Sequence, residues 1–358
     1  SDGKALFEGP AEVLIRASLW LRTAERLFLV LDEFKAFSSD ELFERLYAYD
    51  WKSLMPKNAN ITLARVKIKK SLLKSPRVTQ SVAQKAVYKK MGESYSLNRL
   101  PLSGASYPLH LYIRKDNVIV ALETSGEGLH KRGYRLLSGK APLRETIAAG
   151  LLMLARWNEK IELIDPFCGS GTIPIEAAMI ARHQAPNLHR KFLFEEWELL
   201  SKEVIANERR DARKAIKPTE AKITGYDSDW RMVEYASENA KKAGVMNVCQ
   251  FEKLPMEQVK ADNKYGYILT NPPFGERLKD AEAAFNLYQQ MKHLKKDLPD
   301  WSYFIYSSHE GVEKAFDMNT SKKKAISNSG LQTWLNFFWG PKPPKGVEAD
   351  ADIIGDDE

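Results

Sequence analysis

Two segments of this 358-residue chain constrain its fold more than any other feature. Each is a short apolar run that ends at a polar residue followed by turn formers. Residues 161–172 read IELIDPFCGSGT, and residues 265–277 read YGYILTNPPFGER. Runs this short predict buried strands of a parallel sheet. Ligands of open α/β sheets bind at the carboxyl ends of strands, so we expect Asp165 and Asn271 to face one crevice.

The turn after the first run predicts a ligand site that is not a phosphate loop. Gly169 and Gly171 permit a tight turn into a helix near Thr172, and they let a ligand approach the main chain without meeting a Cβ atom. The motifs G-x-x-x-x-G-K and G-x-G-x-x-G are absent from the sequence. The carboxylate of Asp165 would repel a phosphate, but it suits a cationic or hydroxyl-bearing ligand, such as the amino group of a methionine moiety.

The pairing of D-P-F-C-G-S-G-T with N-P-P-F about a hundred residues later resembles the S-adenosylmethionine (SAM) loop and the catalytic loop of class I amino-methyltransferases. The resemblance implies SAM as the cofactor. Asp227 ends the next predicted strand, where it can accept both ribose hydroxyls or cap the following helix. A backbone amide near Met256 would meet the adenine. The expected SAM-binding residues are Asp165, Phe167, Gly169, Gly171, Thr172, Asp227 and Met256.

The second loop supplies the groups that an amino nucleophile needs. The side-chain oxygen of Asn271 and the carbonyl of Pro272 can each accept one N–H, which directs the nitrogen lone pair at the methyl group. Pro272 and Pro273 stiffen the loop and donate no competing N–H bonds. Phe274 can stack on an extruded base.

Positive charge is concentrated ahead of this predicted catalytic region. The formal net charge is +7, yet residues 51–140 carry 18 Lys and Arg against 4 Asp and Glu, a local balance of +14. Such a block indicates binding of a polyanion, and we expect it to be RNA. The expected RNA-binding residues lie in a basic turn and in a later glycine-rich stretch; they are Lys69, Lys70, Lys74, Arg77, Lys131, Arg132 and Arg135.

The remaining pattern predicts a two-part architecture. Alternating β and α segments after residue 146 imply a doubly wound parallel sheet. Two further strands are expected at 322–328 and 331–338, and the resemblance to class I methyltransferases implies that they form a terminal antiparallel hairpin. A small basic α+β module placed before a methyltransferase resembles a THUMP domain. The expected order is a partial ferredoxin-like subdomain at 1–50, a THUMP-like RNA-binding domain at 51–125, a linker at 126–145, a Rossmann-like class I methyltransferase domain at 146–340 and a disordered acidic tail at 341–358.

Taken together, the motifs G-E-G-L-H-K-R-G-Y-R, A-P-L-R-E-T, D-P-F-C-G-S-G-T-I-P-I-E-A-A and N-P-P-F-G-E-R resemble those of THUMP-containing bacterial 23S rRNA guanine-N2 methyltransferases. The resemblance implies rRNA processing, with 23S rRNA or its precursor as partner. Two alternatives stay open: adenine-N6 methylation of DNA, because N-P-P-[FY] also serves there, and a non-enzymatic RNA-binding protein with a relict fold.

The cysteine and histidine usage argues against other chemistries. Cys168 and Cys249 cannot make a disulfide framework, so we expect a reducing cytoplasm, and we interpret both as small apolar fillers rather than nucleophiles. The six histidines show no metal-ligand spacing, so no metal is expected. No apolar run approaches the roughly 20 residues of a membrane span.

Overall fold

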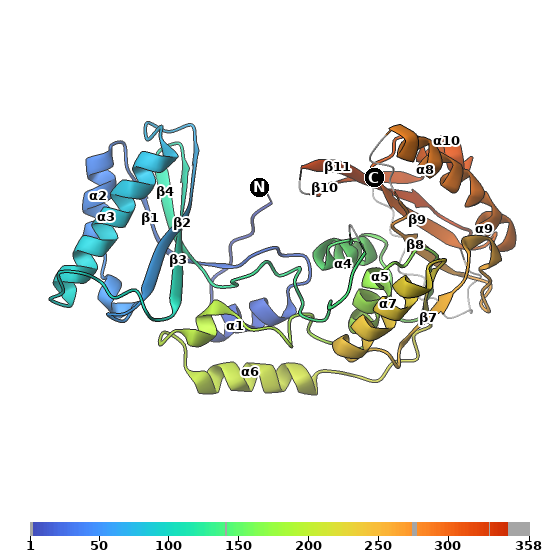
Figure 1. Cartoon of the computed structure of the whole chain (residues 1–358), viewed down its shortest axis with the longest axis horizontal. Helices are drawn as coiled ribbons and strands as arrows, with labels where there is room; N and C mark the ends of the chain where they lie inside the picture. The colour runs from blue at the N-terminus through green and yellow to red at the C-terminus, as the bar shows by residue number, and fades with distance from the viewer. Residues whose placement is uncertain (1–2, 140–141, 274–277, 329, 343–358) are drawn as a thin grey trace. The chain divides into compact units, whose positions relative to one another are not determined.

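The computed structural model describes residues 3–139, 142–273, 278–328 and 330–342. The chain divides into two units (Figure 1). Unit 1 contains Ser1–Leu129 and Arg190–Asp211, and unit 2 contains His130–His189 and Ala212–Glu358. The acidic tail expected at 341–358 lies outside the described residues from position 343 onward. Among the helices that the structure describes, none is long and apolar enough to cross a membrane.

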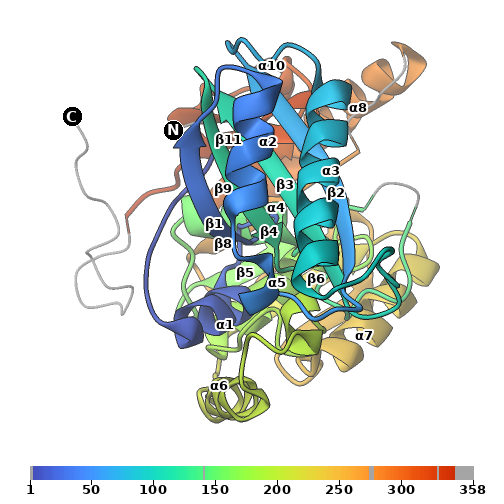
Figure 2. The same cartoon turned by 90° about the vertical axis from the view of Figure 1, so that its left-hand side faces the viewer.

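Unit 1 is built on a four-stranded sheet with strand order β1-β4-β3-β2. Strands β2 and β3 run parallel, and the other neighbours run antiparallel. Helices α2 and α3 lie side by side across one face of this sheet (Figure 2). Its elements are α1 (Ala11–Trp20), β1 (Phe28–Lys35), α2 (Ser39–Ala48), η1 (Trp51–Ser53), β2 (Asn60–Lys69), α3 (Pro76–Ser94), β3 (Ser106–Arg114) and β4 (Asn117–Glu123).

Local sequence signals explain these elements. Ser38 caps α2 by accepting a hydrogen bond from the Glu41 amide, and Ser75 caps α3 in the same way ahead of a proline in the first turn. In β3, alternate residues from Tyr107 to Ile113 point into the core. Because β1 pairs with β4, the first 50 residues belong to the same sheet as the rest of unit 1. The boundary expected at residue 50 therefore does not coincide with a structural division.

An excursion from the second half of the chain completes unit 1. This segment, residues 190–211, contains η2 (Leu193–Glu196) and most of α6 (Lys202–Lys214). Arg190 donates to the carbonyls of Ser125, Glu127 and Gly128 at 2.7–2.8 Å. The indole of Trp197 stacks on Tyr107, with ring centroids 5.1 Å apart, and its N–H donates to the Ser106 carbonyl at 2.9 Å. The segment is therefore part of the core of unit 1.

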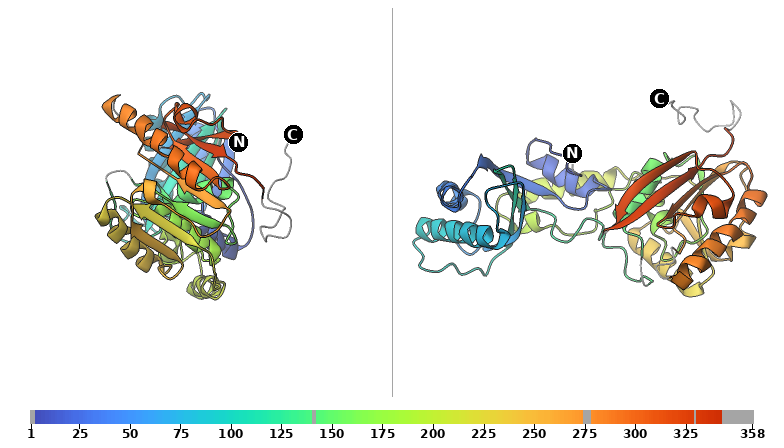
Figure 3. Two further views of the ribbon diagram at one scale, coloured as in Figure 1. Left: turned by 90° about the vertical axis from the view of Figure 1, so that its right-hand side faces the viewer. Right: turned by 90° about the horizontal axis from the view of Figure 1, so that it is seen from above.

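Unit 2 is a seven-stranded sheet of order β10-β11-β9-β8-β5-β6-β7 with helices on both faces (Figure 3). Strands β5 to β9 are parallel, and β11 and β10 close the sheet antiparallel. The elements are α4 (Glu145–Leu154), β5 (Glu162–Asp165), α5 (Thr172–Ala181), β6 (Ile223–Asp227), α7 (Trp230–Ala243), β7 (Cys249–Lys253), η3 (Met256–Gln258), β8 (Gly266–Thr270), α8 (Leu278–Gln290), α9 (Lys292–Asp297), β9 (Ser302–Ser307), α10 (Val312–Phe316), β10 (Lys322–Asn328) and β11 (Leu331–Phe338). The predicted doubly wound sheet with its terminal hairpin is confirmed.

The strand order brings the two marker segments together. β5 lies between β8 and β6, so the chain leaves β5 in one direction for β6 and later returns on the other side as β8. Such a reversal of strand order opens a crevice at the carboxyl ends of the strands. Asp165, Asp227 and Thr270 are the last residues of these three strands and therefore lie at the same edge.

The role of the excursion gives a stability prediction. Trp197→Ala should lower the free energy of unfolding by roughly 3–5 kcal/mol, because it removes a buried ring and leaves the Ser106 carbonyl without its donor. Urea denaturation would measure the change. Trp230→Ala is the matched control, because Trp230 is 59% exposed whereas Trp197 is 2% exposed. Equal losses in the two variants would contradict a structural role for the excursion.

Candidate active site

A hydrogen bond between the ends of two adjacent strands forms the centre of the site. The Thr270 hydroxyl donates to Asp165 Oδ1 at 2.6 Å, and the Phe167 amide donates to the same oxygen at 3.1 Å. Asp165 is 2% exposed, and burial raises the pKa of its carboxyl to about 7, although both hydrogen bonds oppose the rise. The first strand end thus presents a desolvated carboxyl group, whose ionised form a cationic ligand would favour.

The third strand end braces the glycine loop. Asp227 accepts the Gly169 amide on Oδ2 at 3.0 Å and the Asp229 amide on Oδ1 at 2.9 Å. Its side chain is half-buried, and burial raises the pKa of the carboxyl against these two bonds. Each oxygen keeps lone pairs for a further donor. Asp227 can therefore hold the loop and still accept hydroxyl groups from a ligand, while Asp229, rather than Asp227, caps α7.

The two glycines have different roles. Gly171 has φ +84°, and an added Cβ would lie 2.9 Å from the Cβ of Ala236 and 3.1 Å from the ring of Phe251. This glycine is required for packing of the loop. Gly169 has φ +53°, and an added Cβ would meet no heavy atom within 4 Å. The space beside Gly169 is the feature expected where a ligand approaches the main chain.

The second loop carries an unsatisfied acceptor. Asn271 follows Thr270 directly, and its Oδ1 atom is buried without a hydrogen-bond donor among the described residues. An unpaired buried amide oxygen is unfavourable, so its persistence points to a function. Pro272 is buried and Pro273 is exposed. Phe274, expected to stack on a base, lies outside the described residues.

The remaining residues expected at the cofactor have mixed positions. Phe167 is half-buried at the start of the glycine loop, and its ring packs against the core that includes Met256. Met256 is 4% exposed and opens η3, so only its backbone could reach a ligand. Thr172 is buried, and its hydroxyl accepts a bond from Arg135 Nη2 at 2.8 Å. Thr172 therefore links the loop to the preceding segment, and its hydroxyl proton is still available to a further acceptor.

Two residues expected to contact RNA make internal ion pairs in unit 2, Arg132 fully buried and Arg135 half-buried. Arg132 is 1% exposed and bonds to Glu176 at 3.3 Å and to Asn187 at 3.2 Å. Arg135 is paired with Glu145 at 3.4 Å, and burial raises the pKa of the Glu145 carboxyl to about 7 despite the guanidinium charge. Both arginines fasten the segment before α4 to α5. The burial of Arg132 corrects the expectation that it binds RNA, whereas the RNA-binding role of the half-buried Arg135 stays a prediction.

The other predicted basic residues are on the surface. Lys69, Lys70, Lys74, Arg77 and Lys131 are all exposed. The turn that follows β2 is held by Asp116, which accepts the Ser71 hydroxyl at 2.8 Å and the Leu72 amide at 2.7 Å. These bonds hold the pKa of the Asp116 carboxyl below its usual value. The basic turn is therefore a defined surface feature of unit 1.

Sequence inspection overlooked Thr270. Thr270 ends a completely buried strand, where a polar side chain needs a hydrogen-bond partner. This need was the sequence signal that could have identified it.

The two cysteines behave as expected of apolar fillers. Both are buried, and burial raises the pKa of the Cys249 thiol to about 12. Within the described ranges, no group of three or more His, Cys, Asp or Glu side chains could hold a metal ion.

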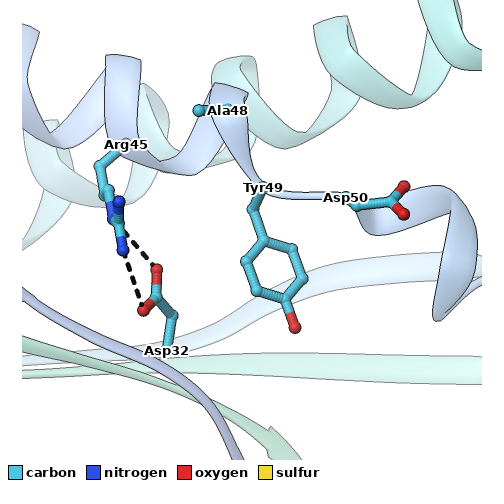
Figure 4. A pocket seen from close by; sticks show the side chains of 5 residues that line it. All are labelled: Asp32, Arg45, Ala48, Tyr49 and Asp50. Atoms are coloured by element: carbon cyan, nitrogen blue, oxygen red, sulfur yellow. Dashed lines mark hydrogen bonds and ion pairs between the residues drawn. The ribbon is translucent and has the colours of Figure 1, made fainter.

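A separate pocket of about 250 Å³ lies in unit 1, where Ala48, Tyr49 and Asp50 surround an ion pair (Figure 4). Arg45 binds both carboxylate oxygens of Asp32, at 3.2 and 3.4 Å. The guanidinium group and this carboxylate neutralise one another. We assign no catalytic role to this pocket, because the polar strand ends described above all belong to unit 2.

Comparison with known sequences identifies a family. Residues 132–335 match the family model described as "RMKL-like, methyltransferase domain". The chain is 37% identical over 347 residues to the putative RNA methyltransferase YpsC of Bacillus subtilis, covering 96% of this chain and 90% of that protein. It is 31% identical to the ribosomal RNA large subunit methyltransferase K/L of Shewanella pealeana, covering 93% of this chain and 48% of that protein. The chain thus spans about half the length of the K/L relatives.

Comparison with solved structures gives the same picture. A predicted N6-adenine-specific DNA methylase from Listeria monocytogenes superimposes with a TM-score of 0.87 at 39% identity, covering 93% of this chain and 87% of that one. The putative methyltransferase SMU.472, complexed with SAH, superimposes with a TM-score of 0.85 at 33% identity, covering 94% and 89%.

The raised pKa of Asp165 predicts pH-dependent SAM affinity. Below pH 7 the carboxyl becomes mostly protonated, and holding the ammonium group of SAM would require loss of that proton. Affinity should therefore fall as pH decreases from 7 to 5, by at most about tenfold per unit. Calorimetric titration would measure it. Asp165→Asn should bind weakly with a flat pH profile, and a sloping profile in that variant would assign the dependence to another group.

Proposed function

Because the chain belongs to the family of RMKL-like methyltransferase domains, we propose that it uses SAM to methylate an exocyclic amino group of RNA, namely guanine N2 of 23S rRNA. The observation that carries the proposal is the buried Oδ1 of Asn271, which has no donor among the residues the structure describes and lies next to the residue that binds Asp165. The motifs support guanine N2 by their resemblance to the guanine-N2 enzymes, and the names of the relatives support RNA.

The SAM-binding groups are arranged around the three strand ends. When bound, SAM supplies an electrophilic methyl group. The carboxylate of Asp165 would accept the ammonium group, and the half-buried carboxylate of Asp227 would accept the ribose hydroxyls. The open space at Gly169 lets the ligand lie against the main chain. Met256 would offer its backbone amide to the adenine.

The role of Asn271 is to position the nucleophile. An amino group attached to a base is a poor nucleophile because its lone pair is delocalised into the ring. Asn271 Oδ1 and the Pro272 carbonyl would each accept one N–H, which favours a tetrahedral nitrogen with its lone pair directed at the methyl group. The two prolines have no N–H to compete for these acceptors. Phe274 would stack on the base.

The DNA alternative has a specific observation behind it, since the Listeria relative is named as a predicted N6-adenine-specific DNA methylase. Asn271 would accept N–H bonds from adenine N6 as readily as from guanine N2. The YpsC and K/L relatives are named as RNA enzymes and favour RNA. Tritium transfer from labelled SAM to 23S rRNA, tRNA and duplex DNA, followed by mass spectrometry of the digested product, would separate the two.

Unit 1 is the proposed RNA-binding, THUMP-like part. The exposed residues Lys69, Lys70, Lys74 and Arg77 come from the end of β2, the following turn and the start of α3. Their charges lie close together along the chain on a turn that Asp116 fixes, so the cost of ordering them on binding is low. Lys131 is a further exposed candidate in unit 2.

The first prediction concerns catalysis. Asn271→Ala should lower kcat by about 10²–10³-fold while leaving the SAM dissociation constant unchanged, because the lost acceptor acts mainly as the nitrogen becomes tetrahedral. Single-turnover methyl transfer and calorimetry would measure the two quantities. Asn271→Asp keeps an acceptor oxygen in the same place and should retain more activity than the alanine variant. Full activity of Asn271→Ala would remove this loop from the mechanism.

The second prediction concerns RNA affinity. Reversing three charges of the basic turn, in a Lys69→Glu, Lys74→Glu and Arg77→Glu variant, should weaken RNA binding. Each phosphate contact of single-stranded RNA contributes roughly 0.7 to the slope of log affinity against log salt, so the slope should fall by about 2. Filter binding at several salt concentrations would measure it.

The matched control reverses the same number of charges elsewhere. Lys214, Lys217 and Lys242 are exposed and belong to unit 2. Replacing these three with glutamate changes the net charge equally but should leave the slope close to that of the unaltered protein. Equal slopes for the two triple variants would place the RNA site outside the basic turn.

A further inference from the structure

The catalytic loop has few ways of being held in place. Pro272 and Pro273 lack an N–H, so this part of the loop can be fixed only through its carbonyl oxygens and its packing. At the start of the loop, Thr270 is bound to Asp165. At its other described end, the carbonyl of Pro273 accepts a hydrogen bond from the hydroxyl of Tyr288 at 3.2 Å. Tyr288 belongs to α8 and is completely buried.

The hydroxyl of Tyr288 is part of a chain of hydrogen bonds in which the donor and the acceptor of each bond are fixed. Tyr288 Oη lies 2.8 Å from the hydroxyl of Ser307, at the end of β9, and the His309 amide donates to that same serine oxygen at 2.9 Å. The Pro273 carbonyl can only accept, so Tyr288 donates its proton to it. Ser307 then donates to Tyr288 and accepts from His309. Every hydroxyl in the chain donates once and accepts once, and such bonds strengthen one another.

The surroundings keep this arrangement rigid. Burial raises the pKa of the Tyr288 phenol to about 12, so the hydroxyl remains a donor at every physiological pH and is not a general base. The ring lies against the imidazole of His309, with centroids 5.7 Å apart. The core around the ring is formed by α8, α9, α10 and the strands below. The Tyr288 hydroxyl therefore anchors the Pro273 carbonyl to a tightly packed core.

We propose that Tyr288 is a positioning residue for the catalytic loop and sets where Asn271 Oδ1 and the Pro272 carbonyl meet the amino group. This inference rests on the proposed function, since it assigns to Asn271 the role of acceptor. Pro273 is two residues from Asn271, and the two intervening peptide bonds end at prolines, so a change in orientation at Pro273 is passed along the loop. A displacement of about 1 Å at a reacting group can lower the rate of reaction about 100-fold.

The test is Tyr288→Phe, which removes one oxygen and keeps the ring. We expect kcat for methyl transfer to 23S rRNA to fall about 10-fold to 100-fold, with unchanged KM for RNA and an unchanged SAM dissociation constant. Tyr303→Phe is the matched control. Tyr303 is 2% exposed in the same core, and its hydroxyl donates to the carbonyls of Leu294 and Leu298 at 2.9 and 2.8 Å, away from the loop. Tyr303→Phe should lower the melting temperature about as much as Tyr288→Phe does, but it should leave kcat unchanged.

A double variant separates positioning from general loss of structure. Asn271→Ala removes one of the two acceptors that Tyr288 positions, so Tyr288→Phe should reduce the residual kcat of Asn271→Ala by a clearly smaller factor than it reduces the kcat of the unaltered protein. An unchanged kcat in Tyr288→Phe would overturn the inference, as would an equal further loss on the Asn271→Ala background or an equal loss of kcat in Tyr303→Phe. Full activity of Asn271→Ala alone would instead overturn the proposed mechanism, so the two failures appear in different variants.

Discussion

The hydrogen bond from Thr270 to Asp165 joins the two halves of the candidate active site. It exists because β5 and β8 are neighbours, although their ends are 105 residues apart in the chain. One residue on from the donor is Asn271, and two residues on from the acceptor is the start of the glycine loop. Asp165 therefore fixes the start of the Asn271 loop, and the same carboxyl group would hold the ligand. A shift of β8 relative to β5 would separate the Thr270 hydroxyl from Asp165 and displace Asn271 from the glycine loop.

The excursion at residues 190–211 places a further constraint on the chain. It leaves unit 2 after α5 and returns to it within α6, yet its contacts are to unit 1. Trp197 fills the space over Tyr107, a completely buried aromatic residue of β3. Arg190 satisfies three carbonyls of the segment after β4. The carbonyl groups that follow β4 thus obtain their donors from a residue more than 60 positions later in the chain.

The strands of unit 2 were predictable from the sequence, whereas the hydrogen bonds of its buried polar side chains were not. Short apolar runs with polar ends identified the parallel strands, and the terminal hairpin was predicted with the bounds observed, 322–328 and 331–338. The burial of Arg132 was not predictable, because an exposed arginine and one paired with Glu176, 44 residues away, look the same in a sequence. Tyr288 was missed for a similar reason, since one helical tyrosine becomes informative only when its hydroxyl is seen to reach Pro273.

The chemistry of the loop also limits what it can select. Pro272 and Pro273 have no N–H and offer only carbonyl oxygens, and Asn271 adds the acceptor Oδ1 beside its own N–H donors. A substrate atom that is itself an acceptor, such as a ring nitrogen or a base carbonyl, would meet like partial charges at these oxygens. An amino group, which brings two N–H donors, is matched. Under the proposed mechanism these acceptors favour an amino group but do not distinguish guanine N2 from adenine N6. Discrimination between bases must therefore come from residues that surround the ring, and discrimination between nucleic acids from surfaces beyond the loop, among which the basic turn of unit 1 is the charged candidate.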